Sequence, residues 1–240
     1  MSNNVTSTQD PKRTPQRENL LLNILLNIVI PTIILTRFSG EDRLGPQLGI
    51  IIALAFPIAY GVRDYFRAYK INFFSALGVV SVTLTGGMSL LELDPQYIAI
   101  KEAAIPAIFG LATLISLKTR YPLVRTFLYN DMVLATEKIE QALDKNGTKP
   151  EFEQTLVRAS WMLAGSFLLS AILNYGLARY LLVSPPGTEA FNAELGKMTA
   201  LSFPVIAVPA MIIMMFALFY LFRNIKRLTQ LDLEDIVQNQ

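Results

Sequence analysis

The chain of 240 residues contains no cysteine and no histidine. The first absence excludes disulfides and thiolate chemistry, and the second removes the usual zinc and non-haem iron ligand sets and the Ser-His triad. Charged residues are also scarce at 17%, whereas a soluble domain carries about a quarter. The formal net charge of +2 is too small to favour a nucleic-acid partner. We therefore expect a non-enzymatic protein with no catalytic residues, no metal site and no cofactor.

Apolar residues, in contrast, make up 52% of the chain and are clustered into long runs. The hydrocarbon core of a bilayer is about 30 Å thick, and a helix needs roughly 17–25 mostly apolar residues to cross it. Six segments meet or approach this length: Leu20–Thr36, Leu48–Val62, Phe73–Leu91, Tyr97–Leu117, Ala159–Val183 and Met198–Phe222. The sequence thus predicts an all-α membrane protein with six transmembrane helices, four within residues 20–117 and two within residues 159–222.

Lysine and arginine are unevenly shared between the two sides that six spans would create. One side holds sixteen of them: Lys12, Arg13, Arg17, Arg63, Arg67, Lys70, Lys118, Arg120, Arg125, Lys138, Lys145, Lys149, Arg158, Arg223, Lys226 and Arg227. The other side holds four: Arg37, Arg43, Arg179 and Lys197. Because cytoplasmic loops carry the excess of Lys and Arg, we expect the rich side, and both termini with it, to be cytoplasmic.

Three polar segments lie outside the predicted spans: a disordered cytoplasmic tail at residues 1–19, a cytoplasmic helical linker at 118–158 and a cytoplasmic tail at 223–240. Within the linker, apolar residues at three-to-four spacing give a helix one apolar face. They are Met132, Ala135, Ile139, Ala142 and Leu143. This short amphipathic helix either lies on the bilayer or docks on the bundle, or else recruits a separate partner.

Two signals mark the end of this helix and the start of the next. Asn146-Gly147 predicts a helix stop, and Thr148-Lys149-Pro150-Glu151 predicts a capping box with proline in the first turn. No interruption follows before the fifth span. One long helix is therefore expected to leave the cytoplasm and cross the membrane.

Lys101 and Glu102 lie inside the fourth predicted span, about one turn from its outer end and ahead of Pro106. Charges inside a membrane are costly and tend to face partners or cavities. One interpretation is an ion-pair site, or the lining of an ion or solute path. The other is that Lys101 extends to the outer interface while Glu102 pairs with a neighbouring helix.

Uncharged polar residues and prolines recur within the spans. Asn27 (one turn after Asn23) and Asn174 either bridge transmembrane helices or extend the path that Lys101 and Glu102 would line. Thr83 and Thr85 invite the same two interpretations. The prolines predict kinked helices, which occur in transporters and in ordinary membrane helices alike. They are Pro31, Pro57, Pro106, Pro204 and Pro209.

Cations flank the predicted cytoplasmic ends of the spans. Five of them are candidate contacts for anionic lipid headgroups: Arg63, Arg67, Lys70, Arg120 and Arg125. Their alternative role is only to fix the topology. Membrane lipids are the expected partners in either case.

Several short motifs together resemble an uncharacterised family of bacterial multi-pass inner-membrane proteins that is distantly similar to the intracellular septation protein A family. The motifs are Leu44-Gly45-Pro46, Tyr60-Gly61 with Arg63-Asp64, Lys101-Glu102-Ala103-Ala104-Ile105-Pro106 and Tyr121-Pro122-Leu123-Val124-Arg125. The resemblance covers roughly residues 20 to 128. It implies a bacterial inner-membrane protein without enzymatic mechanism, and it points to Lys101 and to residues 122–125 as positions of interest.

The resemblance also implies a role. Relatives of the septation type are associated with envelope biogenesis, division and elongation machinery, and the maintenance of membrane properties. We therefore expect a septation-associated scaffold or membrane-homeostasis factor that binds envelope or division proteins or associates with itself. The alternative is a small transporter or channel with a polar path near Lys101 and Glu102. The longer cytoplasmic segment of this chain departs from the smaller septation-type proteins.

Overall fold

The computed structural model of the protein describes residues 24–68, 73–119, 122–130 and 134–237. All the regular structure in these ranges is helical, apart from one antiparallel bridge between Leu134 and Val237. The predicted tail at residues 1–19 lies outside them, as do Asn23, Lys70, Met132 and Arg120. The predicted all-α class is confirmed for the described part of the chain.

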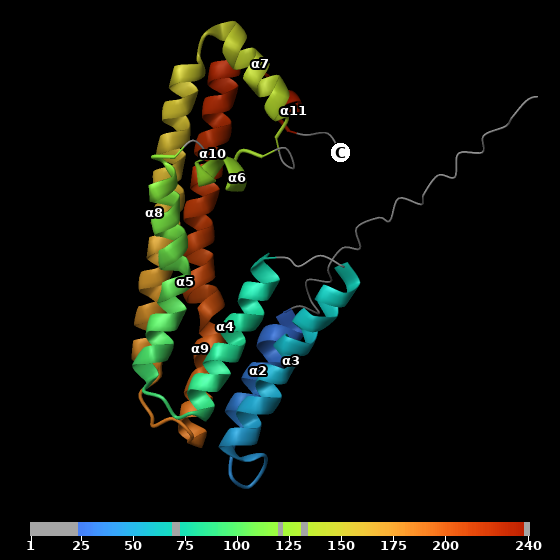
Figure 1. The fold of residues 1–240 in the computed structure, drawn as a ribbon, viewed down its shortest axis with the longest axis vertical. Helices are drawn as coiled ribbons and strands as arrows, with labels where there is room; N and C mark the ends of the chain where they lie inside the picture. The colour runs from blue at the N-terminus through green and yellow to red at the C-terminus, as the bar shows by residue number, and fades with distance from the viewer. Residues whose placement is uncertain (1–23, 69–72, 120–121, 131–133, 238–240) are drawn as a thin grey trace, which may run out of the picture.

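Three helices at the N-terminal end lie side by side (Figure 1). The first is one continuous helix that the structure divides into η1 (Leu25–Val29), α2 (Ile30–Ile33) and η2 (Ile34–Phe38). It is followed by α3 (Gly45–Ala68) and α4 (Phe73–Leu90). α3 packs along α4, and two glycines bring them close: a Cβ on Gly61 would lie 2.5 Å from Val79, and one on Gly86 would lie 2.2 Å from Leu54.

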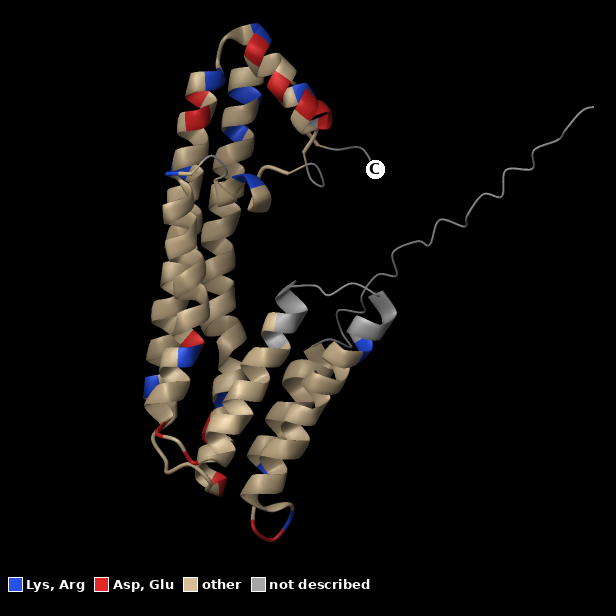
Figure 2. Cartoon of the chain, in the orientation of Figure 1, with Lys and Arg blue, Asp and Glu red and all other residues tan. Residues whose placement is uncertain are grey.

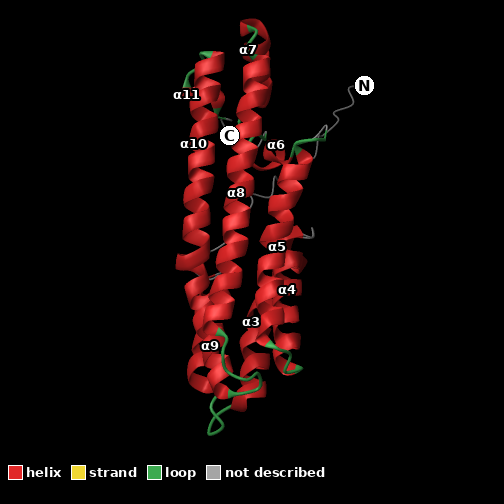
Figure 3. Cartoon of the chain, turned by 90° about the vertical axis from the view of Figure 1, so that its left-hand side faces the viewer, coloured by secondary structure: helices red, strands yellow, loops and turns green. Residues whose placement is uncertain are grey.

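The rest of the chain forms a longer bundle. It contains α5 (Pro95–Ser116), α8 (Lys149–Leu181) and a continuous helix divided into α9 (Glu189–Ser202), η3 (Phe203–Ala207) and α10 (Val208–Thr229). α5 and α8 make the most extensive contact of the structure, and α10 packs along the other side of α8 (Figure 3).

In the residues that the structure describes, each of the six predicted spans is largely helical. Four helices are long and apolar enough to cross a bilayer: Gly45–Arg63, Pro95–Ser116, Lys149–Leu181 and Glu189–Thr229. Among the described residues the other two apolar helices are shorter, at Leu25–Phe38 and Val79–Leu90. The chain therefore has the helices of an integral membrane protein, and for the two shorter helices a span stays a prediction.

Prolines widen two of these helices. A proline has no N–H for the carbonyl four residues earlier, so the regular helical bond is lost there. The π-helical stretch η1 directly precedes the turn that contains Pro31, and η3 contains Pro204 and ends just before Pro209. Pro57 and Pro106 instead lie inside the α-helical stretches of α3 and α5.

The two groups of helices meet closely at the end that carries the connections between α2 and α3, α4 and α5, and α8 and α9 (Figure 1). There α9 packs against η2 and α2. A Cβ on Gly196 would lie 2.9 Å from Thr36, 3.1 Å from Leu35 and 3.3 Å from the carbonyl oxygen of Thr32. Only a glycine allows the two helices to approach this closely.

At the opposite end, three short helices cover the tips of α8 and α10 (Figure 1). They are α6 (Leu123–Phe127), α7 (Thr136–Asn146) and α11 (Leu233–Ile236). Together with residues 149–159 of α8 and 217–229 of α10 they enclose a hydrophobic core of their own, and we call this unit the cap. Its fully buried members include Ile139, Phe152 and Ile225. α7 docks on the bundle through Ile139 and Leu143, the apolar face that the sequence predicts.

α7 ends and α8 begins where the sequence predicts. The predicted capping box at the start of α8 is wrong. Gly147 ends α7 in the left-handed region at φ 66°, and α8 starts at Lys149 with Pro150 in its first turn. Thr148 makes no side-chain capping bond and instead donates its hydroxyl to the carbonyl oxygen of Leu228 at 3.0 Å. The last turn of α10 leaves carbonyls without helical partners, and these compete successfully for the hydroxyl.

Asn146 also connects the α7–α8 junction to the end of α10, through two hydrogen bonds. Its amide lies 3.1 Å from the carbonyl oxygens of both Leu228 and Thr229. We expect Asn146→Ala to cost about 1–2 kcal/mol, because the Thr229 carbonyl loses the Asn146 donor and the Leu228 carbonyl keeps only the hydroxyl of Thr148. Hydrogen exchange of α7 measures the effect, with the exposed neighbour Lys145→Ala as control. Equal exchange in the two variants would contradict the role of the amide.

Candidate functional site

The charged pair predicted inside the membrane lies between α4 and α5. The Asp94 side chain accepts from the amide of Gln96 at 2.8 Å and so caps α5, with Pro95 at its first position. Lys101 follows Pro95 by six residues, which places it about 9 Å along the helix. Lys101 and Glu102 are the charged residues within α5, and Figure 2 shows blue and red on this otherwise tan helix.

The ammonium group of Lys101 is enclosed by acceptors. Its Nζ lies 2.6 Å from Glu102 Oε1 and 2.6 Å from Thr85 Oγ1. It also lies 3.1 Å from the hydroxyl and 3.2 Å from the carbonyl oxygen of Ser81. Only 9% of the Lys101 side chain and 23% of the Glu102 side chain are exposed. We call Ser81, Thr85, Lys101 and Glu102 the α4–α5 polar cluster.

This geometry leaves no donor of the ammonium group unused. A lysine has three N–H donors, and four acceptors lie within hydrogen-bond distance of them. Lys101 therefore does not extend to the outer interface, which was one of the two interpretations of the sequence. The observed arrangement is the ion pair, with the charge of Lys101 offset by its neighbour Glu102.

The cluster is also the main connection between α4 and α5. α4 packs chiefly against α3, and α5 chiefly against α8, so that α4 and α5 touch only sparsely. Ser81 and Thr85 lie one turn apart on α4 and present their oxygens to α5. In the part of the chain that the structure describes, no group of three or more acidic residues could hold a metal ion.

The two asparagines of the predicted path, Asn27 and Asn174, are not members of the α4–α5 polar cluster. The amide of Asn174 donates to the carbonyl oxygen of Ser170 at 2.8 Å, within its own helix α8. Asn27 is half-buried in η1, has a partner of its own and belongs to a helix that packs against α3 and α9. The structure thus brings Lys101 and Glu102 together with α4, and the hydrogen bonds of Asn174 do not join them.

Of the cluster, the sequence points to Thr85, Lys101 and Glu102, but Ser81 was missed. Its signal is the spacing of four residues to Thr85, which places both hydroxyls on one face of a helix. Thr83, which was singled out with Thr85, is exposed and donates to the carbonyl oxygen of Val79 at 2.8 Å.

Two of the five candidate headgroup cations have described side chains. Arg63 is exposed near the end of α3. Arg125 instead joins three elements of the cap: its guanidinium pairs with Glu153 of α8, lies 3.8 Å from Glu140 of α7 and sits 5.9 Å from the centre of the Tyr129 ring. The side chains of Arg67, Lys70 and Arg120 lie outside the described part.

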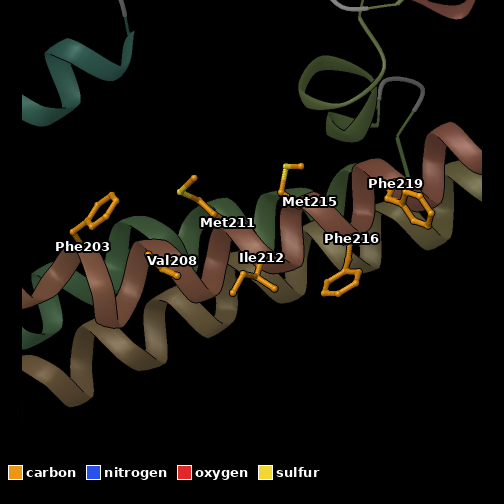
Figure 4. Close-up of a pocket in the computed structure, with 7 residues that line it drawn as sticks. All are labelled: Phe203, Val208, Met211, Ile212, Met215, Phe216 and Phe219. Carbon is orange, nitrogen blue, oxygen red and sulfur yellow. The ribbon is translucent and has the colours of Figure 1, made fainter. Parts of the chain in front are cut away.

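A groove of about 620 Å³ lies elsewhere, on the exposed side of η3 and α10, and its lining is apolar (Figure 4). Lys101, Glu102 and Asn174 do not line it.

In the part of the chain that the structure describes, fold and site together show a helical protein with four helices long and apolar enough to cross a membrane, a buried ion pair between two helices and a helical cap at one end. No protein-family model matches the chain, and neither a curated protein nor a solved structure is similar enough to match it.

Proposed function

We propose that the protein is a non-enzymatic scaffold of the bacterial inner membrane that presents its cap to an envelope or cell-division protein. The cap is the observation that carries the proposal. α8 has 33 residues and the helix from Glu189 to Thr229 has 41, so both exceed the length needed to cross a bilayer. Their surplus turns fold with α6, α7 and α11 around a separate core.

The charge pattern supports a cytoplasmic position for the cap. Figure 2 shows many Lys and Arg residues on α7 and on the adjoining ends of α8 and α10. The opposite end has few of them, among them Arg37, Arg43, Arg179 and Lys197. By the excess of positive charge in cytoplasmic segments, the cap end and both termini face the cytoplasm. The resemblance to the septation family supports a partner of the envelope or division class.

α7 supplies the surface for such a partner. Its inner face is buried through Ile139 and Leu143, while its outer face is exposed and carries charges of both signs. The exposed residues are Glu137, Lys138, Glu140, Gln141, Asp144 and Lys145. A surface of mixed charge provides specificity without an exposed apolar patch that would cause aggregation.

Photo-crosslinking tests the proposal. A photoreactive residue at Gln141 of the full-length protein, in its native membrane, is expected to give a reproducible adduct with an envelope or division protein. The same residue at Asp42, exposed in the connection at the other end, is the matched control and should give no such adduct. Adducts with unrelated proteins alone, or equal adducts at both positions, would overturn the proposal.

A transporter is the second candidate, favoured by the buried ion pair at the sparsely packed boundary of α4 and α5. The closed shell of acceptors around Lys101 and the separate position of Asn174 support the scaffold instead. A flux measurement on the purified, reconstituted protein discriminates between the two. Ion flux into proteoliposomes that disappears when both Lys101 and Glu102 are replaced by neutral residues, in a protein that still folds, would favour transport.

A further inference from the structure

One face of α10 is covered by large apolar side chains that touch little else. Above Phe203 of η3, the face consists of Val208, Met211, Ile212, Met215, Phe216 and Phe219. Met215, Phe216 and Phe219 are 63–66% exposed, although they belong to the largest side chains of the helix. In Figure 4, Met211 and Met215 point to one side of the helix, and Ile212 and Phe216 to the other. The groove of about 620 Å³ follows this face.

The dimensions of the face fit a lipid chain. Val208 and Phe219 are eleven residues apart, which corresponds to about 17 Å along the helix. One leaflet contributes about half of the hydrocarbon core of about 30 Å. A second helix is a poorer fit, because close packing of transmembrane helices needs small residues, and the face has none between Met211 and Phe219 except on its buried side.

Cations continue the face beyond its apolar part. Arg223 follows Phe219 by four residues and Lys226 follows it by seven, so helical spacing places both above the groove. Both are exposed. Lys226 lies 3.5 Å from Asp232, whose side chain is 86% exposed, and such a surface pair is weak enough to exchange for another anion.

Neighbouring residues give the depth of these cations in the membrane. Ser166 donates to the carbonyl oxygen of Ala210 at 2.9 Å, so Phe219 of α10 is level with residues around 157 of the antiparallel α8. Trp161, 60% exposed, and the exposed Arg158 lie close to this level. Tryptophan and arginine gather at the membrane–water interface. Arg223 lies about 6 Å further along α10, at the depth of lipid phosphates.

We propose that this face of α10 binds one anionic phospholipid, with an acyl chain in the groove from Val208 to Phe219 and the phosphate between Arg223 and Lys226. The groove has the length of one leaflet, and two positive charges lie at its end. These charges favour an anionic headgroup over the zwitterionic headgroups of the surrounding lipids. A guanidinium can donate two parallel hydrogen bonds to a phosphate, and Lys226 adds a point charge. The proposal is independent of the scaffold function, because it uses no residue of α7.

Native mass spectrometry of the full chain, released from detergent with added phosphatidylglycerol or phosphatidylcholine, tests the site. Phosphatidylglycerol should be retained preferentially, and the double variant R223Q/K226Q should weaken its binding about tenfold or more. The control K118Q/K145Q removes two exposed positive charges at the same end and should retain it. M215A/F219A should also weaken the binding of phosphatidylglycerol, and it should leave the binding of soluble glycerol phosphate unchanged.

Four results would overturn the proposal. Equal retention of the two lipids would remove the charge preference, and equal loss in R223Q/K226Q and in the control would reduce it to diffuse attraction. Full retention by M215A/F219A would exclude the groove. A dimer that M215A/F219A dissociates would show that a second copy of the chain occupies the face instead.

Discussion

Replacing Lys101 by methionine is expected to destabilise the protein by about 3–5 kcal/mol, the range for breaking one side of a buried ion pair. The substitution keeps the length of the side chain and removes its charge. Glu102, whose Oε1 lies 2.6 Å from Lys101 Nζ, then loses the cation that offsets its charge inside the membrane. Thr85 and Ser81 lose the donor that joins α4 to α5.

The double variant K101M/E102Q separates the loss of the pair from the loss of packing. With both charges removed, we expect stability to return to within about 1–2 kcal/mol of the wild type. Unfolding in mixed micelles, followed by circular dichroism, gives the free energies. If the double variant is as unstable as K101M, the uncompensated charge of Glu102 is not the cause. In that case the hydrogen bonds to Ser81 and Thr85 contribute most of the stabilisation.

Hydropathy predicts where the long apolar helices lie, because a helix that crosses lipid must satisfy its backbone internally and be apolar outside. Each predicted segment is helical, and the long uninterrupted helix that starts after Gly147 is present as α8. The boundaries differ where the helices leave the apolar region. α9 begins nine residues before its predicted span, because its polar turns find partners at that end of the molecule. α8 begins ten residues before the fifth span, as expected for the long helix that starts after Gly147.

Side-chain partners could be predicted only where the free-energy cost of burying a charge leaves few possible environments. An intramembrane Lys next to a Glu has few acceptable environments, so an ion pair was among the interpretations of the sequence. The two α4 hydroxyls that complete it lie 16 and 20 residues before Lys101 in the sequence. Thr85 was singled out as a polar residue of its span without a partner being predicted, and Ser81 was missed. Thr148 shows the limit in the other direction. Its local pattern fits a capping box, but the carbonyl of Leu228 is a competitor 80 residues away.

The cap could not be predicted as a unit, since its core is assembled from five separate segments of the chain. Periodicity identified the apolar face of α7, but not α6 or α11, which have five and four residues and are too short for a periodic signal. The positive charge of Arg125 was a candidate for lipid headgroups. In the structure it faces Glu153 and Glu140, which approach it only once α7 and α8 are folded.

Phe152→Ala is expected to open this cap and leave the membrane helices folded. The Phe152 side chain is 2% exposed and its ring lies 5.1 Å from that of Tyr129 in an edge-to-face arrangement. Truncating a buried phenylalanine to alanine costs about 3–5 kcal/mol, and the loss falls on a core that α5 does not share. Hydrogen exchange should accelerate strongly in α6 and α7, while α5 remains protected. Gln154 is exposed and lies about half a turn further along α8. Gln154→Ala should leave the exchange of α6, α7 and α5 unchanged.

The helices in which hydrogen exchange accelerates in Phe152→Ala show whether the cap and the bundle unfold separately or together. Acceleration confined to the cap would show that it opens as a separate cooperative unit, as expected for a core joined to the bundle chiefly through α8 and α10 and only by a small contact between α6 and α5. Uniform acceleration through α5 would instead mean that cap and bundle unfold together. If the cap opens alone, the crosslink at Gln141 should disappear in F152A while lipid retention at Arg223 weakens less, because Arg223 depends on α10 and not on α7. A variant that lost both equally would place the two surfaces in one cooperative unit.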